Sequence, residues 1–161
     1  MNRKYTIQDF DEVVKRLRNA FNEVALTTDI IVGFPGETEE EFQTTYNYLK
    51  KVNFYKMHIF KYSPRKGTKA AVMLNQVDGK IKEERSNKLI QLSNKNQKLF
   101  LNKYIGKVVE VLFEQKEGEF MKGHTKNYLV VKTKNESIQN EIIKVKINKE
   151  QNLELLGNTM K

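Results

Sequence analysis

Two short loops hold the residues whose types and spacing could do chemistry. Residues 33–37 (Gly-Phe-Pro-Gly-Glu) directly follow an apolar, β-branched run and precede an acid-rich helix start, and residues 63–68 (Ser-Pro-Arg-Lys-Gly-Thr) follow a second apolar segment. Glycine leaves main-chain groups bare, so a flat or polar small molecule can approach the backbone at such a loop. A tight connection between a strand and a helix needs the same residue types, and the first loop alone does not separate the two interpretations.

The elements that would position these loops alternate between helix and strand. The pattern predicts a helix from Ile7 to Phe21, a strand within 24–34, a helix after Thr38 and a strand over 56–62. Thr6 and Thr38 each stand three residues before an acid, as in a capping box. This order is typical of an α/β fold with parallel strands, and the apolar first strand is expected to be buried on both faces. Ligands of such folds bind at the carboxyl ends of the strands, where both loops would lie.

Charged and titratable residues near the loops have a functional and a structural interpretation. Arg65 and Lys66 are suited to neutralise phosphates, although an exposed basic loop is the alternative. His58 lies within a predicted strand and is expected to be structural rather than catalytic. Of the 29 basic side chains, 12 fall in residues 56–103 with only 3 acidic ones, and such a local excess attracts nucleic acid.

The remainder of the chain predicts one or two amphipathic helices and then a small barrel. Residues 80–104 have amphipathic helical spacing, and short period-two strands follow Gly106, with turns expected at 117–118, 122–123 and 148–149. About 55 residues of short strands suggest a closed β-barrel of the OB or SH3 kind. Aromatic and basic residues alternate around Gly123, a pattern that suits base stacking and phosphate neutralisation but is also found on other small barrels. They are Phe120, Lys122, His124, Lys126 and Tyr128.

Composition restricts the kinds of site that the chain can hold. It has no cysteine and two histidines, so neither a disulfide nor a thiolate metal site is possible and a histidine zinc site is not expected. No apolar run reaches the roughly 18 to 20 residues that a membrane span needs. We therefore expect a cytoplasmic protein with no membrane partner, no metal site and no catalytic residue of its own.

Two segments carry a specific family resemblance. Residues 27–38 (Thr-Thr-Asp-Ile-Ile-Val-Gly-Phe-Pro-Gly-Glu-Thr) and 58–71 (His-Ile-Phe-Lys-Tyr-Ser-Pro-Arg-Lys-Gly-Thr-Lys-Ala-Ala) resemble the late strands of radical S-adenosylmethionine (SAM) methylthiotransferases. Residues 1–6 resemble the segment that follows that family's central strands. Within this family, the sequence is most similar to the branch that modifies threonylcarbamoyladenosine in tRNA. Residues from about 103 to the end look like its TRAM domain, a small RNA-binding barrel.

The resemblance implies a division of the chain and a set of cofactors. Residues 1–75 would be the carboxyl-terminal part of a TIM-like radical SAM barrel, 76–104 a helical linker and 105–161 the TRAM domain. The full-length parent enzyme would use S-adenosylmethionine and 4Fe–4S clusters to add a methylthio group to tRNA. Because the clusters are held by cysteines and this chain has none, no cofactor is expected to bind it tightly. It would bind tRNA, and its partner would be the missing amino-terminal portion of the same enzyme.

The same resemblance implies site residues. The adenosyl group would lie against a wall made of Ile31, Gly33, Phe34, Phe60 and Tyr62. The tRNA would contact Arg65, Lys66, Lys122, His124, Lys126 and Tyr128. A different class remains open, a non-catalytic RNA-binding adaptor in which residues 1–70 only support the barrel. A complete small phosphate-binding enzyme is a third possibility, but no nucleophile with a partner base can be named for it.

Overall fold

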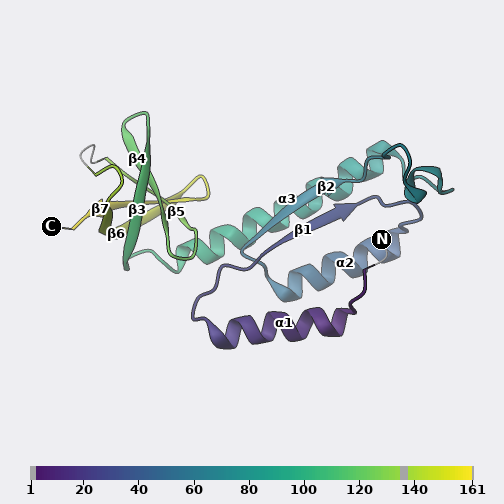
Figure 1. Ribbon diagram of the computed structural model, residues 1–161, viewed down its shortest axis with the longest axis horizontal. Coiled ribbons are helices and arrows are strands. Elements are labelled where there is room, and N and C mark those ends of the chain that lie inside the picture. Colours follow the sequence, from purple (N-terminus) through teal and green to yellow (C-terminus); the bar gives the residue numbers. More distant parts are fainter. Residues whose placement is uncertain (1–2, 135–137, 161) are drawn as a thin grey trace.

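The structure, a computed structural model, describes residues 3–134 and 138–160. Figure 1 shows a helix-and-strand part at one end, which contains the amino terminus, and a β-barrel at the other end, which contains the carboxyl terminus. Helix α3 runs from the first part to the barrel. The sequence-based expectation of a mixed α/β part followed by a small all-β part is confirmed.

The first part has the predicted order of elements. They are α1 (Ile7–Ala20), β1 (Thr27–Val32), α2 (Glu39–Val52), β2 (Lys56–Lys61), the 3-10 turn η1 (Lys69–Val72) and α3 (Gly79–Asn102). Both capping boxes are present: the Thr6 hydroxyl accepts from the Asp9 N–H, and the Thr38 hydroxyl accepts from the Glu41 N–H. Each box satisfies helix N–H groups that have no partner within the helix, so α1 and α2 begin where the sequence predicts.

Strands β1 and β2 form a two-stranded parallel sheet that is covered on one face. Val32 and Met57 are buried with Phe42 and Leu89 of the helices in one apolar cluster. The alternate positions are open, and Phe60 is 52% exposed. The prediction that the first strand is buried on both faces is therefore wrong, because α1, α2 and α3 cover a single face and no other described element covers the second.

The second part is a closed five-stranded barrel. Its strands are β3 (Val108–Glu117), β4 (Phe120–Thr125), β5 (Val130–Thr133), β6 (Ile142–Gln151) and β7 (Glu154–Thr159). They follow the order β3-β4-β5-β7-β6, and every pair is antiparallel except β5 with β7. The turn predicted at 117–118 lies where β3 ends. Those predicted at 122–123 and 148–149 are wrong, because both segments lie within strands.

The two parts share core residues at their junction. Leu101 and Tyr104, at the end of α3, are buried in the barrel core together with Tyr55, which immediately precedes β2. The Gln97 amide donates to the Leu153 carbonyl at 3.3 Å, and the Asn127 amide donates to the Tyr104 hydroxyl at 2.8 Å. Since α3 also packs on β2 through Leu89, one helix fixes the barrel relative to the sheet. No helix in the described ranges is both long and apolar enough to cross a membrane.

Candidate ligand and RNA-binding sites

The open face of the sheet brings together several of the expected ligand residues. Ile31 and Phe60 are direct partners in the parallel register, and both point away from the helices because they alternate with buried neighbours. With Tyr62 and Arg65 they line a shallow hollow of about 370 Å³ beside the loop 63–68. Four residues that the sequence analysis assigned to a ligand or to RNA therefore lie around one hollow at the carboxyl ends of the strands.

Phe34 and Tyr62 pack against each other where the two loops meet. Their ring centroids are 5.2 Å apart in an edge-to-face arrangement. The Lys82 ammonium donates to the Tyr62 carbonyl at 3.1 Å and lies 5.7 Å from its ring centroid. The Tyr62 hydroxyl is buried and has no hydrogen-bond partner in the described part of the chain. Because this hydroxyl is covered by the protein, it is not open to a ligand in this arrangement.

Gly33 is required by the shape of its loop rather than by contact with a ligand. It is buried, with φ +70°, and a Cβ added to it would come within 2.3 Å of the Lys82 Cγ. Its N–H donates to the Glu37 carboxylate at 2.7 Å, which closes the loop on itself. Gly33 therefore shapes the loop that presents Phe34, and it does not line the hollow with Ile31 and Phe60.

A buried arginine, which the sequence analysis missed, holds this loop. Arg85 of α3 is 5% exposed at its side chain, and its Nη1 lies 2.6 Å from the Glu37 carboxylate. Its Nη2 lies 3.2 Å from Glu39, and the guanidinium stacks 5.2 Å from the Phe42 ring centroid. The available signal was helical spacing, since Arg85 stands four residues before the buried Leu89 on the same face of α3.

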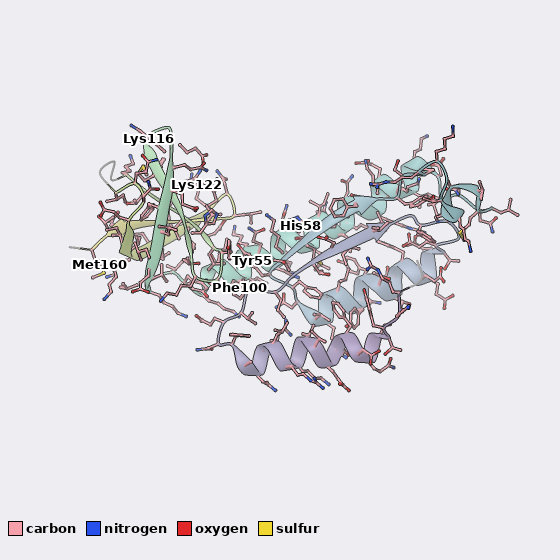
Figure 2. All side chains as sticks on the ribbon, viewed as in Figure 1. Tyr55, His58, Phe100, Lys116, Lys122 and Met160 are labelled. Atoms are coloured by element: carbon pink, nitrogen blue, oxygen red, sulfur yellow. The ribbon has the colours of Figure 1, made fainter. Side chains whose placement is uncertain are left out.

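The described residues do not suit an iron–sulfur cluster. The chain has no cysteine, and within residues 3–134 and 138–160 no three His, Cys, Asp or Glu side chains gather as metal ligands. His58 lies on the exposed side of β2, where its partner across the sheet is Asp29. Figure 2 shows His58 on the sheet, near the junction that Tyr55 marks. Because protein-bound clusters need thiolates, no cluster chemistry can be assigned to these residues.

Tyr128 projects from the barrel. It is 80% exposed with φ 62°, in a turn closed by its N–H donating to the Thr125 carbonyl at 2.9 Å. Its ring centroid lies 6.1 Å from that of His124, whose Nδ1 is 2.6 Å from the Glu114 carboxylate. Lys126 is 86% exposed and pairs with Glu110 at 2.6 Å; this hydrogen bond lowers the pKa of Glu110. An exposed ring beside a histidine and a lysine can stack on a base and contact phosphate.

Lys122 is held in a network of four charges. It lies 3.1 Å from Glu117 and 3.3 Å from Glu154, and both carboxylates also pair with Lys132, which is directly opposite on β5. The hydrogen bonds that both lysines donate to Glu117 and Glu154 raise the pKa of each lysine. Like charges opposite each other destabilise a sheet, and the two carboxylates offset that repulsion. Lys122 is therefore less available to a phosphate than Lys126.

The basic loop residues are open to solvent. Arg65 and Lys66 are both exposed, and neither forms an ion pair with a carboxylate in the described part of the chain. A turn in which the Thr68 N–H donates to the Arg65 carbonyl at 3.1 Å holds them beside the hollow. They are placed to act together with the open face and lie on a different part of the molecule from Tyr128.

The chain is similar in sequence to a family profile and to several known proteins. The Radical SAM superfamily profile matches residues 1–49. The threonylcarbamoyladenosine tRNA methylthiotransferase MtaB of Bacillus subtilis is 44% identical over 153 residues, covering 91% of this chain and 34% of the relative. A tRNA-2-methylthio-N(6)-dimethylallyladenosine synthase of Fusobacterium nucleatum is 42% identical, covering 92% and 35%. That of Aquifex aeolicus is 39% identical, covering 98% and 36%.

The matches extend across both the sheet part and the barrel part, since they cover more than nine-tenths of the chain. The chain spans about a third of the length of these relatives. The similarity is comparable for relatives whose names give two different modified adenosines. Over more than nine-tenths of its length the chain is therefore similar to part of the radical SAM tRNA methylthiotransferases.

Proposed function

We propose that this chain is the carboxyl-terminal portion of a tRNA methylthiotransferase that adds a methylthio group to a modified adenosine beside the anticodon. In this proposal residues 1–75 complete a radical SAM barrel and residues 105–161 are a TRAM domain that binds tRNA. The relatives' names and the third of their length that the chain spans support it. By itself the chain binds tRNA in the cytoplasm and catalyses nothing, because it has no cysteine to hold a cluster.

The exposure of Tyr128 is the observation that best supports tRNA binding. A large aromatic ring that is 80% exposed contributes nothing to the barrel core, and stacking on an unpaired base would bury it. Lys126 adds a cation whose surface ion pair with Glu110 is easily exchanged for a phosphate. Lys122 and His124 flank this surface, but both already contact carboxylates, so they contribute less.

The open face of the sheet suits the adenosyl part of S-adenosylmethionine. Ile31 and Phe60 offer apolar contact, and Phe34 with Gly33 shapes the neighbouring loop. In the full-length enzyme this cofactor would supply the methyl group and the radical chemistry. Arg65 and Lys66 would hold tRNA phosphates close to it.

Fluorescence anisotropy with labelled tRNA tests the RNA surface. We expect Tyr128→Ala to weaken binding by about 1 to 3 kcal/mol, the usual range for a stacked base, and to leave the melting temperature unchanged because the ring is exposed. Tyr5→Ala is a matched control, since Tyr5 is also exposed at 53% but lies at the other end of the molecule. Equal affinity of parent and Tyr128→Ala at every salt concentration would exclude this surface.

The absence of cysteine favours one alternative, an RNA-binding adaptor that uses the sheet part only as a scaffold. Nuclear magnetic resonance with S-adenosylmethionine at millimolar concentration distinguishes the two. Chemical shift changes that are confined to residues around Ile31 and Phe60, and that are abolished in Phe60→Ala, support the proposal that the chain is a portion of a tRNA methylthiotransferase. No shift at these residues, with tRNA binding intact, supports the adaptor.

A further inference from the structure

A second pocket lies at the junction of the sheet part and the barrel. It occupies about 330 Å³ between the ends of α1 and α2, the segments that precede β1 and β2, and the end of α3. Tyr55 and Phe100 form part of its wall, and Figure 2 shows them close together at the junction. The pocket is at the amino ends of the strands, whereas Ile31 and Tyr62 lie toward the carboxyl ends. It is therefore separate from the open-face hollow.

Three cations from three elements converge on this junction pocket. The Arg18 guanidinium donates to the Val52 carbonyl and, at 3.2 Å, to the Asn53 carbonyl, so the negative end of α2 holds it at the rim. Lys51 and Lys103 are exposed, and in the described part of the chain neither is paired with a carboxylate.

The acid in the pocket lining is already engaged elsewhere. Glu23 pairs with Lys107 at 2.5 Å, and the Glu23 carbonyl accepts from the Asn127 amide at 3.1 Å. Its charge is therefore directed toward the barrel and is compensated there. The pocket retains a net positive field from the three cations, which favours an anionic ligand.

Aromatic rings form the other half of the lining. The Tyr55 and Phe100 ring centroids are 5.0 Å apart, and the Lys103 ammonium lies 5.5 Å from the Phe100 centroid. Phe21, the residue that ends α1, is 58% exposed at the rim. An exposed ring beside unpaired cations is the combination that stacks on a base while neutralising its phosphate. A bare anion would use the cations and leave Phe21 in water.

We propose that the junction pocket binds a nucleotide, with its phosphate between Lys51 and Lys103 and its base against Phe21. The volume is at the lower end of the range for small-molecule sites and suits a single nucleotide. The nucleotide is either a free nucleoside monophosphate or one residue of an RNA strand, since both present the same chemistry. Tyr128 is not part of the pocket lining, although its neighbour Asn127 contacts Glu23 there, and the inference does not depend on the function proposed above.

Calorimetric titration of the purified chain with AMP, adenosine and inorganic phosphate tests the pocket. We expect AMP to bind more tightly than either component, and Lys51→Ala/Lys103→Ala to weaken AMP binding by about tenfold, in line with the loss of two phosphate contacts. The matched control is Lys50→Ala/Lys95→Ala, which removes equal charge from exposed positions on α2 and α3 outside the pocket. Equal affinity of the two double variants for AMP would overturn the proposal.

A second variant separates stacking from charge. Phe21→Ala should weaken AMP binding by about fivefold or more and leave the binding of inorganic phosphate unchanged, whereas Tyr5→Ala, a similarly exposed ring outside both the junction pocket and the open-face hollow, should leave both unchanged. Both rings are more than half exposed, so the variants should stay folded, and their thermal unfolding curves check this. Equal AMP binding by parent and Phe21→Ala contradicts the proposal.

Competition with a short RNA shows whether the pocket binds a free nucleotide or one residue of an RNA strand. If the site takes one residue of a strand, an unphosphorylated tetranucleotide should compete with AMP and should bind less well to Lys51→Ala/Lys103→Ala. If it takes free nucleotide, AMP should bind and the tetranucleotide should not compete. If the parent chain binds tRNA through Tyr128 but does not bind AMP, this inference alone is refuted. If the parent chain binds AMP but Tyr128→Ala does not weaken tRNA binding, only the proposed RNA surface is refuted.

Discussion

The ion pair between Arg85 and Glu37 gives the sharpest test of how the first loop is held. Arg85 is 5% and Glu37 16% exposed at the side chain, and their closest atoms are 2.6 Å apart. The same Glu37 carboxylate accepts the Gly33 N–H at 2.7 Å. Replacing Arg85 with methionine keeps a long apolar side chain over Phe42 but leaves this carboxylate without its cation.

Breaking a buried pair from one side typically costs about 3 to 5 kcal/mol. Glu37 keeps the Gly33 N–H and some contact with water, so we expect Arg85→Met to lose about 2 to 3 kcal/mol. For a chain of this size that corresponds to a fall in melting temperature of about 4 to 12 °C. Urea denaturation followed by circular dichroism measures the loss directly.

Two further variants make the result specific. Glu37→Gln keeps an acceptor for the Gly33 N–H, so the double variant with Arg85→Met should recover at least about 1 kcal/mol relative to the sum of the single losses. Glu12→Gln, which breaks the exposed pair with Arg16, should cost about 0.5 kcal/mol or less. A loss for Arg85→Met no larger than that for Glu12→Gln would show that the pair does not hold the loop.

Other expectations concern pH, backbone packing and local stability. Burial, with a 2.6 Å hydrogen bond to Asp11, raises the pKa of Tyr48 to about 12. The protonated Tyr48 hydroxyl therefore stabilises the fold fully below about pH 10, and this contribution is lost as the pH rises through 12. The free energy of unfolding in urea should fall over this pH range in the parent but not in Tyr48→Phe. A Cβ on Gly123 would lie 2.1 Å from the Leu112 carbonyl oxygen, so Gly123→Ala should lose about 1 to 3 kcal/mol in the same assay, whereas Gly79→Ala meets open space and should not. Amide exchange should be slower in the closed barrel than in the two-stranded sheet, whose edges are unpaired; faster exchange in the barrel would contradict this.

Local rules predicted the first half of the fold because its signals lie within a few residues of each other. The capping boxes at Thr6 and Thr38 depend on a partner three residues away, and the parallel pairing follows from the alternation of helix and strand. The single covered face was not predictable in this way. It depends on how many elements surround the sheet, and the apolar run 30–32 at the end of β1 resembles a strand covered on both faces.

The candidate sites likewise contain residues that local signals predict and residues that only the fold brings together. Ile31 and Phe60 were predictable, because the period of two puts them on one face once the strands pair in register. Arg85 with Glu37 and Lys122 with Glu154 are separated by 48 and 32 positions in the chain, and only the fold brings them together. The local sequence around Gly123 predicts a turn, but the residue lies within β4. The glycine is required there by the close approach of β3, which is also non-local.

Helix α3 explains why the two parts form one unit. Leu89 is fully buried in the cluster beneath the sheet and Leu101 is fully buried in the barrel core. Twelve residues of α-helix advance by about 18 Å and turn by about 120° beyond three whole turns, so the helix presents different faces to the two cores. This dual use makes its apolar spacing irregular in the sequence. It also fixes the direction in which Tyr128 projects relative to the open face, so any RNA held by the barrel meets the sheet part at a set distance.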